Sequence, residues 1–215
     1  GMTTKNEVLS HRLRHVYWLG GGSGAGKSTV ARRLATTYGL QLYSTDDAMA
    51  DHGRRCEPEA CPFLTAFKEM DMDERWLNRS PELMLETFHW YRGEAFGLIV
   101  EDLLALPADQ GVLVEGFRLL PRLVKPLLKS NGQAAWLIPT PEFRLAAFTT
   151  RGTLMDIAGK TSAPSRALEN LLRRDDMFTS RLEREVKDER LPIINVGSVM
   201  CVDDLTSRVA ELFGL

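Results

Sequence analysis

Nine consecutive residues near the N-terminus have the types and the spacing of a phosphate-binding loop. The first eight match the pattern G-x-x-x-x-G-K-[ST] and are Gly21, Gly22, Ser23, Gly24, Ala25, Gly26, Lys27 and Ser28, and the ninth is Thr29. Glycines let backbone N–H groups approach phosphate oxygens, because no Cβ stands in the way. Lys27 brings a positive charge to the β- and γ-phosphates, and the Ser28 hydroxyl is placed to ligate Mg²⁺. The motif therefore predicts a site for nucleotide phosphates, and it leaves the base and the fate of the phosphates open.

Three carboxylates come at the ends of two stretches that are typical of strands. Asp46 and Asp47 follow residues 40–44, and Glu115 closes the apolar run 111–114. The carboxyl ends of parallel strands share the ligand-binding edge of a sheet, so all three acids should lie near the phosphate loop. Asp46 is then placed to accept a proton from a substrate hydroxyl, Asp47 to contact the substrate, and Glu115 to hold Mg²⁺ directly or through water. Alternatively, the Asp pair caps the next helix and Glu115 makes a structural hydrogen bond.

Basic residues between positions 151 and 174 are candidates to neutralise the charge that spreads over the γ-phosphate oxygens during transfer. They are Arg151, Lys160, Arg166, Arg173 and Arg174. Of these, Arg174 is expected to act in catalysis and Arg166 to contact the nucleotide. The alternative is a solvated helix face.

Aromatic and charged residues gather at positions 89–94, in the segment where we expect the phosphate acceptor to bind. His89, Trp90, Tyr91 and Arg92 lie together there. We expect Arg92 and the earlier Arg54 to bind the acceptor. Aromatic residues at helical spacing are also typical of a core, and His89 alone indicates little.

Three cysteines give no indication of a disulfide framework. Cys56, Cys61 and Cys201 are an odd number, and a cytosolic chain rarely keeps disulfides. His52 together with Cys56 and Cys61 fits no structural zinc spacing, and a fourth ligand is missing. We therefore expect ordinary thiols and no metal at these residues.

The elements that must position these side chains alternate between strand and helix. The predicted strands cover residues 15–19, 40–44, 111–116, 134–138 and 191–196. The main predicted helices cover residues 29–35, 81–106, 141–151, 165–189 and 203–212. Ser80 as N-cap and Pro81 at the first helical position mark the start of the second of these helices. This alternation predicts an α/β fold in three layers, α/β/α, with a five-stranded parallel sheet.

Two segments interrupt this alternation. Residues 48–80 indicate short helices and loops, and residues 152–164 have the composition of a mobile loop. We expect a single domain over residues 3–215, with a helical acceptor-binding insertion at 48–110, between strands 2 and 3, and a lid at 151–174.

The composition is that of an ordinary globular protein. The chain has 215 residues, 44% of them hydrophobic and 26% charged, with a net charge of −2. This charge provides no general attraction to nucleic acid or to an anionic membrane. No apolar run approaches the length of a membrane span, and the N-terminus has no apolar leader. We therefore expect a cytoplasmic protein.

Three stretches together resemble the small P-loop kinases. They are the phosphate loop, Ser44-Thr45-Asp46-Asp47 and Val114-Glu115-Gly116. This group includes shikimate, gluconate, nucleoside and nucleotide kinases, chloramphenicol phosphotransferase, polynucleotide 5′-kinase and zeta toxins. The resemblance implies that Asp46 is the base or binds the acceptor, and that a lid arginine is Arg166, Arg173 or Arg174. The third strand ends in Glu-Gly rather than the glycine-rich turn of shikimate kinases, and the Asp-Gly-Asp of gluconate kinases is absent. Residues 48–110 match no member.

These observations predict an ATP- and Mg²⁺-dependent kinase that phosphorylates a hydroxyl of a small molecule. A first alternative changes the acceptor to a nucleotide, a nucleic-acid 5′ end or a zeta-toxin-like nucleotide sugar, and the acidic balance weighs against a polynucleotide. A second alternative is an ATP- or GTP-binding switch with slow hydrolysis, and the absence of an Asn-Lys-x-Asp stretch weighs against GTP. A third is a family member that binds nucleotide without catalysis.

Overall fold

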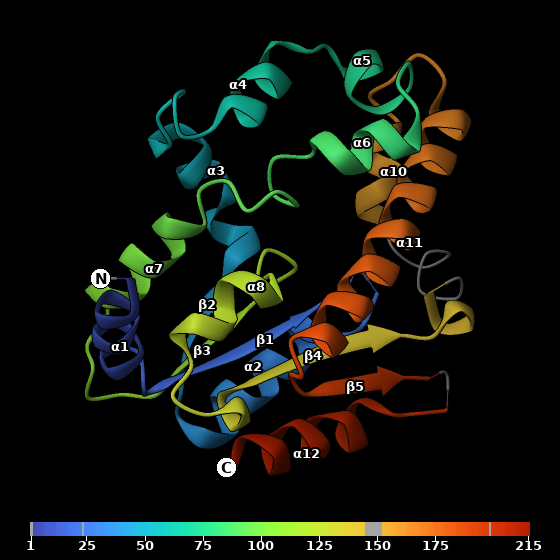
Figure 1. The fold of residues 1–215 in the computed structure, drawn as a ribbon. Helices are drawn as coiled ribbons and strands as arrows, with labels where there is room; N and C mark the ends of the chain where they lie inside the picture. Colours follow the sequence, from blue (N-terminus) through green and yellow to red (C-terminus); the bar gives the residue numbers. More distant parts are fainter. Residues whose placement is uncertain (1, 23, 145–151, 198) are drawn as a thin grey trace.

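The computed structural model describes residues 2–22, 24–144, 152–197 and 199–215 and has an α/β fold (Figure 1). Five strands form one parallel sheet in the order β2-β3-β1-β4-β5. They are β1 (Val16–Gly21), β2 (Gln41–Ser44), β3 (Val112–Glu115), β4 (Ala134–Pro139) and β5 (Ile193–Val196). The predicted five-stranded parallel sheet is therefore confirmed.

Helices cover both faces of this sheet because its strands are apolar on both sides. On one face, α2 (Lys27–Tyr38) and α12 (Val202–Phe213) pack against Leu19, Leu113 and Leu137. On the other face, Trp18 and Trp136 are fully buried. The elements over that face are α1 (Met2–Arg12), α7 (Phe96–Ala105), α8 (Pro121–Val124), η1 (Lys125–Leu127) and the C-terminal half of α11 (Pro164–Asp188), while η2 (Asn131–Gln133) leads into β4.

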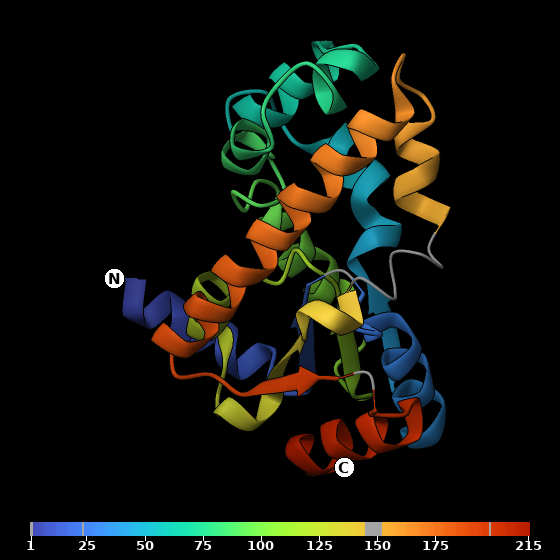
Figure 2. The ribbon, with the colours of Figure 1, turned by 90° about the vertical axis from the view of Figure 1, so that its right-hand side faces the viewer.

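A group of helices stands beyond the carboxyl edge of the sheet (Figures 1 and 2). It consists of α3 (Thr45–Arg55), α4 (Pro62–Glu69), α5 (Met72–Trp76), α6 (Pro81–Thr87) and α10 (Gly152–Ala158). In both views the long helix α11 runs from the sheet into this group. It therefore connects the sheet edge to the insertion between β2 and β3.

The helix predicted over residues 81–106 is wrong as a single element. The structure has α6 and α7 instead, with turns over residues 88–95. α6 ends where its C-cap, Phe88, adopts an extended backbone (φ −68°, ψ 116°). Gly93 (φ 84°) and Ala95 (φ 64°) then adopt left-handed conformations before α7 begins. The start was predicted correctly, since the Ser80 side chain accepts a hydrogen bond from the Leu83 N–H at 3.1 Å. The break turns the aromatic residues 88–91 out of a helix.

The loop predicted over residues 152–164 is also partly wrong, because α10 occupies Gly152–Ala158. Ala158 is buried with Trp76 and Leu171, so tertiary packing supports a helix that the glycine-rich composition did not indicate. Ser162 anchors the following turn, donating hydrogen bonds from its N–H (2.7 Å) and hydroxyl (2.6 Å) to the Asp73 carboxylate. The helix predicted from residue 141 is present at residues 141–144, and its remainder lies outside the described residues.

The expectation of free thiols at the first two cysteines is wrong. Cys56 and Cys61 form a disulfide, with their Cα atoms 6.2 Å apart, and Cys201 is free and exposed. The short connection between α3 and α4 brings the pair together, a proximity that a count of cysteines cannot reveal. No helix in the described part of the chain combines the length and the apolar character that a bilayer crossing requires.

Candidate active site

The phosphate loop joins β1 to α2 as its motif predicts. Gly24 (φ 80°) and Gly26 (φ 82°) adopt left-handed conformations, which only glycine takes without strain. Lys27 is 8% exposed and donates a hydrogen bond from Nζ to the Gly22 carbonyl at 3.1 Å. A Cβ on Gly22 would clash with the Thr179 hydroxyl of α11, so this glycine permits close packing of loop and helix. Ser23 lies outside the described residues.

Sheet register places the predicted carboxylates at the same edge. Leu19 of β1 and Ser44 of β2 both lie level with Glu115 of β3. Glu115 is only 3% exposed, and burial raises the pKa of its carboxyl group, as do the nearby Asp46 and Asp47. The charge of Lys27 and a hydrogen bond from Ser44 act in the opposite direction on that pKa. Lys27 and the three acids therefore act on one another electrostatically.

Helix α3 begins where these strands end. Its N-cap is Ser44, so the interpretation of Asp46 and Asp47 as N-caps is wrong, and both acids lie in the first turn. There they face the positive end of the helix dipole. Gly116 (φ 147°) lets the chain turn past α3, because a Cβ at this position would clash with the Thr45 hydroxyl. The start of α3, and with it Asp46, is held against the end of β3.

A cavity of about 370 Å³ connects the phosphate loop to the insertion. Lys27, Ser28 and Asp46 line it on the side of the sheet, and Thr153, Leu154 and Ile157 line it from α10. The rest of the lining consists of Met49, Phe67, Trp76, Phe88, His89, Trp90, Tyr91, Phe117, Arg174 and Asp175. Its volume is that of a small-molecule site.

Arg174 and Asp175 form a buried ion pair in the wall of this cavity. Arg174 is 5% exposed, and its Nε and Nη2 donate to Asp175 Oδ1 at 3.1 and 2.8 Å. The Tyr91 hydroxyl donates to the same oxygen at 3.0 Å, and burial raises the pKa of Tyr91, which keeps this hydroxyl protonated. Arg174 Nη1 is buried and has no hydrogen-bond partner within the described part of the chain. This nitrogen is a donor that a bound ligand can satisfy.

The structure brings only some of the predicted site residues to this cavity. Lys27, Ser28, Asp46 and Arg174 line it, and Glu115 and Asp47 lie close enough to act electrostatically. Arg54 does not line it: its side chain is 73% exposed and lies 3.8 Å from Asp51.

The other predicted basic residues also lie elsewhere. The Arg92 guanidinium stacks 3.9 Å from the centre of the Phe63 ring and donates to the Glu86 carbonyl. Arg173 pairs with Glu82 at 3.2 Å, whereas Lys160 and Arg166 are exposed. Arg151 lies outside the described residues. Arg54 and Arg92, which were expected to bind the acceptor, are thus not among the residues that line the cavity.

The sequence did not indicate most of the aromatic residues that line the cavity. Phe67, Trp76 and Phe117 come from three separate segments, and no spacing connects them. The run at 89–91 was a usable signal, but it is equally typical of a core. Asp175 was missed as well, although its position next to Arg174 is a signal for an ion pair.

A buried network behind the wall holds Trp90 in place. The Arg118 guanidinium stacks 4.3 Å from the Trp90 ring and donates from Nη1 to His52 Nδ1 at 2.9 Å. His52 Nε2 in turn donates to Asp102 at 2.7 Å, and the Tyr43 hydroxyl donates to the same carboxylate at 2.6 Å. Burial lowers the pKa of His52, consistent with a neutral ring. Both nitrogens of His52 are occupied, so this residue has a structural role.

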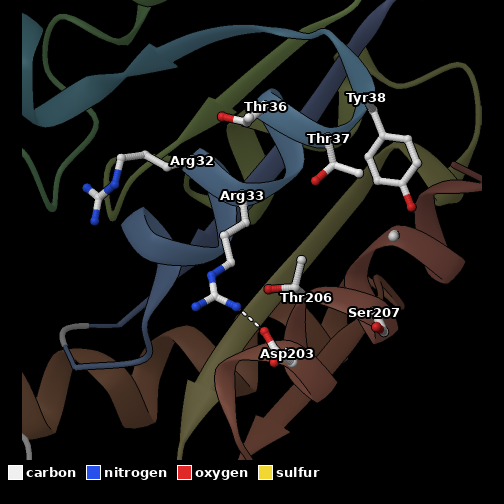
Figure 3. A pocket seen from close by; sticks show the side chains of 9 residues that line it. Arg32, Arg33, Thr36, Thr37, Tyr38, Asp203, Thr206 and Ser207 are labelled. Carbon is white, nitrogen blue, oxygen red and sulfur yellow. Dashed lines mark hydrogen bonds and ion pairs between the residues drawn. The ribbon is translucent and has the colours of Figure 1, made fainter.

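A larger pocket of about 560 Å³ lies between α2 and α12, away from the phosphate loop (Figure 3). Arg33 points across it to Asp203, with which it forms an ion pair, and Thr206 lies beside them. Both charged side chains are largely exposed, and the residues around them are ordinary surface residues of two helices. The smaller, ring-lined cavity is therefore the better candidate, because it contains the phosphate-loop lysine.

Comparisons with known proteins give no family. No protein-family model matches the chain, and no curated protein matches it. Among solved structures, the chain is similar to an uncharacterized protein from Eubacterium ventriosum ATCC 27560, with 15% identity and a TM-score of 0.47. The match covers 93% of this chain and 97% of the other. Nothing about function is inferred from it.

Proposed function

We propose that this protein is an ATP- and Mg²⁺-dependent kinase that transfers the γ-phosphate to a hydroxyl group of a small molecule. The observation that carries the proposal is that Lys27, Ser28 and Asp46 line one cavity, and that this cavity extends into the insertion. A phosphate donor at the loop and an acceptor in the insertion would then meet at Asp46.

The residues present suit the phosphates of ATP with Mg²⁺. Left-handed glycines, a buried lysine and the N-terminus of α2 offer backbone N–H groups and positive charge to phosphate oxygens. Ser28 and Glu115 supply the hard oxygen ligands that Mg²⁺ prefers, and the bound ion would neutralise charge between the β- and γ-phosphates. Glu115 has to be ionised for this role, and the charge of Lys27 favours that form.

In the proposed reaction, the acceptor oxygen forms a bond to the γ-phosphorus and the bond from that phosphorus to the β,γ-bridging oxygen breaks. The hydroxyl proton passes to the Asp46 carboxylate, and ADP leaves. Lys27 stabilises the charge on the transferring group. Arg174 is proposed to add a second positive charge through Nη1, for which none of the described residues supplies a hydrogen-bond partner.

The test is ADP release from Mg·ATP with and without pooled hydroxyl-bearing metabolites, with the Lys27→Ala variant as the blank. We expect one pool to stimulate ADP release by the wild type and not by the variant. Tight ATP binding with slow hydrolysis that no pool stimulates would instead favour the ATP-binding switch.

A further inference from the structure

Aromatic rings dominate the end of the cavity that lies away from the phosphate loop. Phe67, Trp76, Phe88, Trp90 and Phe117 all contribute to the lining. Phe67, Phe88 and Phe117 are only partly buried, so these rings are not fully used by the core. Phe88 packs edge-to-face against Trp76 (6.1 Å) and Tyr91 (4.8 Å) between ring centres, which fixes its orientation. The rings form a rigid, preformed wall suited to a flat ligand.

Three of these rings each make a cation–π contact with an arginine guanidinium group. Arg75 lies 4.4 Å from the centre of Phe67, Arg118 lies 4.3 Å from Trp90, and Arg174 lies 4.6 Å from Phe88. An aromatic cage without such groups attracts cations through the negative faces of its rings. Asp175 balances much of the charge of Arg174, so repulsion of a positively charged ligand comes mainly from Arg118 and Arg75. The wall therefore disfavours amines and accepts a neutral ring.

His89 supplies a polar atom within this wall. The residue is 2% exposed, it lines the cavity, and its Nδ1 has no hydrogen-bond partner among the residues that the structure describes. A buried polar atom without a partner is uncommon, and a ligand that carries a ring nitrogen, an N–H group or a carbonyl would satisfy it. A heteroaromatic ring has such groups at its edge, whereas a plain hydrocarbon ring has none.

We propose that the phosphate acceptor is an uncharged alcohol that carries a planar heteroaromatic ring, the class to which nucleosides belong. Its ring would stack in the ring-lined end of the cavity, its edge would reach His89, and its hydroxyl arm would extend toward Asp46. This proposal rests on the kinase function proposed above, which supplies the reason for a hydroxyl at Asp46. The volume of about 370 Å³ limits the acceptor to a small molecule.

The test measures binding without turnover. Ligand-observed NMR and calorimetry are carried out on the full chain saturated with Mg²⁺ and a non-hydrolysable ATP analogue, which keeps the adenine-binding position filled. The probes are nucleosides and pyridoxine, compared with ribose and inositol, which have hydroxyls without a ring, and with choline, which is cationic. We expect at least one heteroaromatic probe to bind about 10-fold or more tightly than ribose, inositol and choline, since base stacking on an aromatic residue accounts for factors of this size. Equal or tighter binding of ribose, inositol or choline, or no binding of any heteroaromatic probe, would overturn the proposal.

Variants locate the binding site. Phe88→Leu keeps an apolar side chain and removes the ring, and we expect it to weaken binding of the preferred probe by about 10-fold. Phe63→Leu is the matched control, because Phe63 stacks with Arg92 outside this cavity, and it should change the affinity less than about 2-fold. Phe117→Leu provides a second measurement if Phe88→Leu does not fold. Unchanged affinity in the folded ring variants would refute the assignment.

Binding and turnover separate this proposal from the kinase function. If a heteroaromatic probe binds at Phe88, and neither it nor any metabolite pool stimulates ADP release from Mg·ATP, the kinase function is contradicted and the binding site remains. An aliphatic polyol that is phosphorylated would support the kinase function and overturn the acceptor class.

Discussion

Two neighbouring aspartates illustrate how position separates residues of the same type. Asp46 lines the cavity with Lys27 and Ser28, whereas Asp47, one residue further along α3, does not. Both are exposed and both act on the pKa of Glu115. Asp46 and Asp47 are therefore a matched pair for mutagenesis. Each substitution removes one carboxylate near Glu115, but only Asp46 lines the cavity in which we expect the substrate.

We predict that Asp46→Asn lowers the rate of phosphoryl transfer by about 100-fold or more, because general-base catalysis contributes factors of this order. Asp47→Asn should keep the rate within about 3-fold of the wild type, because its side chain does not line the cavity. ADP release under saturating acceptor, together with ATP affinity from calorimetry, distinguishes the two. Equal losses in both variants, or a loss of ATP binding in Asp46→Asn, would remove Asp46 from the role of base.

Glu115 combines burial with a proposed contact to Mg²⁺. Burial raises the pKa of its carboxyl group, so the ionised form is lost at a higher pH than for an exposed glutamate. Mg²⁺ binding requires the ionised carboxylate of Glu115. We therefore predict that the Mg²⁺ concentration for half-maximal ADP release increases as the pH falls from 8 toward 5. Glu115→Gln should raise this concentration at pH 8 and flatten its dependence on pH, and an unchanged dependence would show that Glu115 is not a ligand.

At the scale of elements, the insertion depends on contacts that hold its short helices in place. The disulfide closes the connection from α3 to α4, and Cys61 is packed with Leu64 beside Trp90. Met49 of α3, which lines the cavity, packs against the same cluster. The ring-lined wall and the disulfide are thus parts of one packed unit.

We predict that Cys56→Ser lowers the free energy of unfolding by about 2 kcal/mol, the value that a chain-entropy estimate provides for so short a loop. Urea denaturation of the wild type with and without reductant should reproduce the difference. Cys201→Ser is the control, and its stability should stay within about 0.5 kcal/mol of the wild type. Cys201 is exposed and forms no disulfide, and a serine can keep the N-cap hydrogen bond that its Sγ accepts from the Asp204 N–H. Equal stability of Cys56→Ser and the wild type under oxidising conditions would contradict the disulfide.

Two glycines test how α3 is held against the sheet. Gly116→Ala introduces a Cβ that clashes with Thr45 and strains a positive φ, so we expect it to displace the start of α3 and to lower both stability and the rate of transfer. Gly53→Ala lies within α3, where no atom stands within 4 Å of the new Cβ, and it should stabilise the protein by about 0.5–1 kcal/mol. Thermal unfolding of both variants is the measurement, and a Gly116→Ala protein as stable as Gly53→Ala would contradict this account.

At the scale of the whole molecule, a histidine in the cavity wall couples stability to pH. Burial, together with Arg118, Arg75, Arg174 and Lys68, lowers the pKa of His89 from 6.5 to about 3. When folding lowers the pKa of a histidine, its neutral form contributes stability. This contribution is complete at pH values above the pKa that the histidine has in the unfolded chain. That stability is lost as the pH falls from about 6.5 toward 3, because the unfolded chain takes up the proton first.

We predict that the wild type loses about 2 kcal/mol more stability between pH 7.5 and 5 than His89→Phe, which keeps a ring but cannot titrate. The free energy of unfolding from urea titrations at both pH values is the measurement. His11→Gln, at an exposed histidine, should follow the wild type. A pH dependence that is the same in His89→Phe and the wild type would show that His89 is not neutral and buried.

Sequence patterns were enough to predict the parallel sheet and the glycine loop between β1 and α2, because both depend on local signals. Buried strands appear as apolar runs, and the loop appears as glycines, lysine and serine at fixed spacing, with Asp46 and Glu115 assigned to its edge by the strand ends. Three features appeared only in the folded structure: the wall of the cavity, the disulfide and the split of the predicted helix 81–106. The wall depends on contacts between separate segments of the chain, such as Phe67 with Phe88 and Tyr91 with Asp175. The disulfide joins residues close in sequence, but the turn that brings them together is set by the packing of α3 and α4. Arg54 and Arg92 were reasonable acceptor residues by type, but neither lines the cavity. Arg54 is exposed beside Asp51 on α3, and Arg92 stacks on Phe63 from the turns between α6 and α7. Orientation of this kind is fixed by packing rather than by composition.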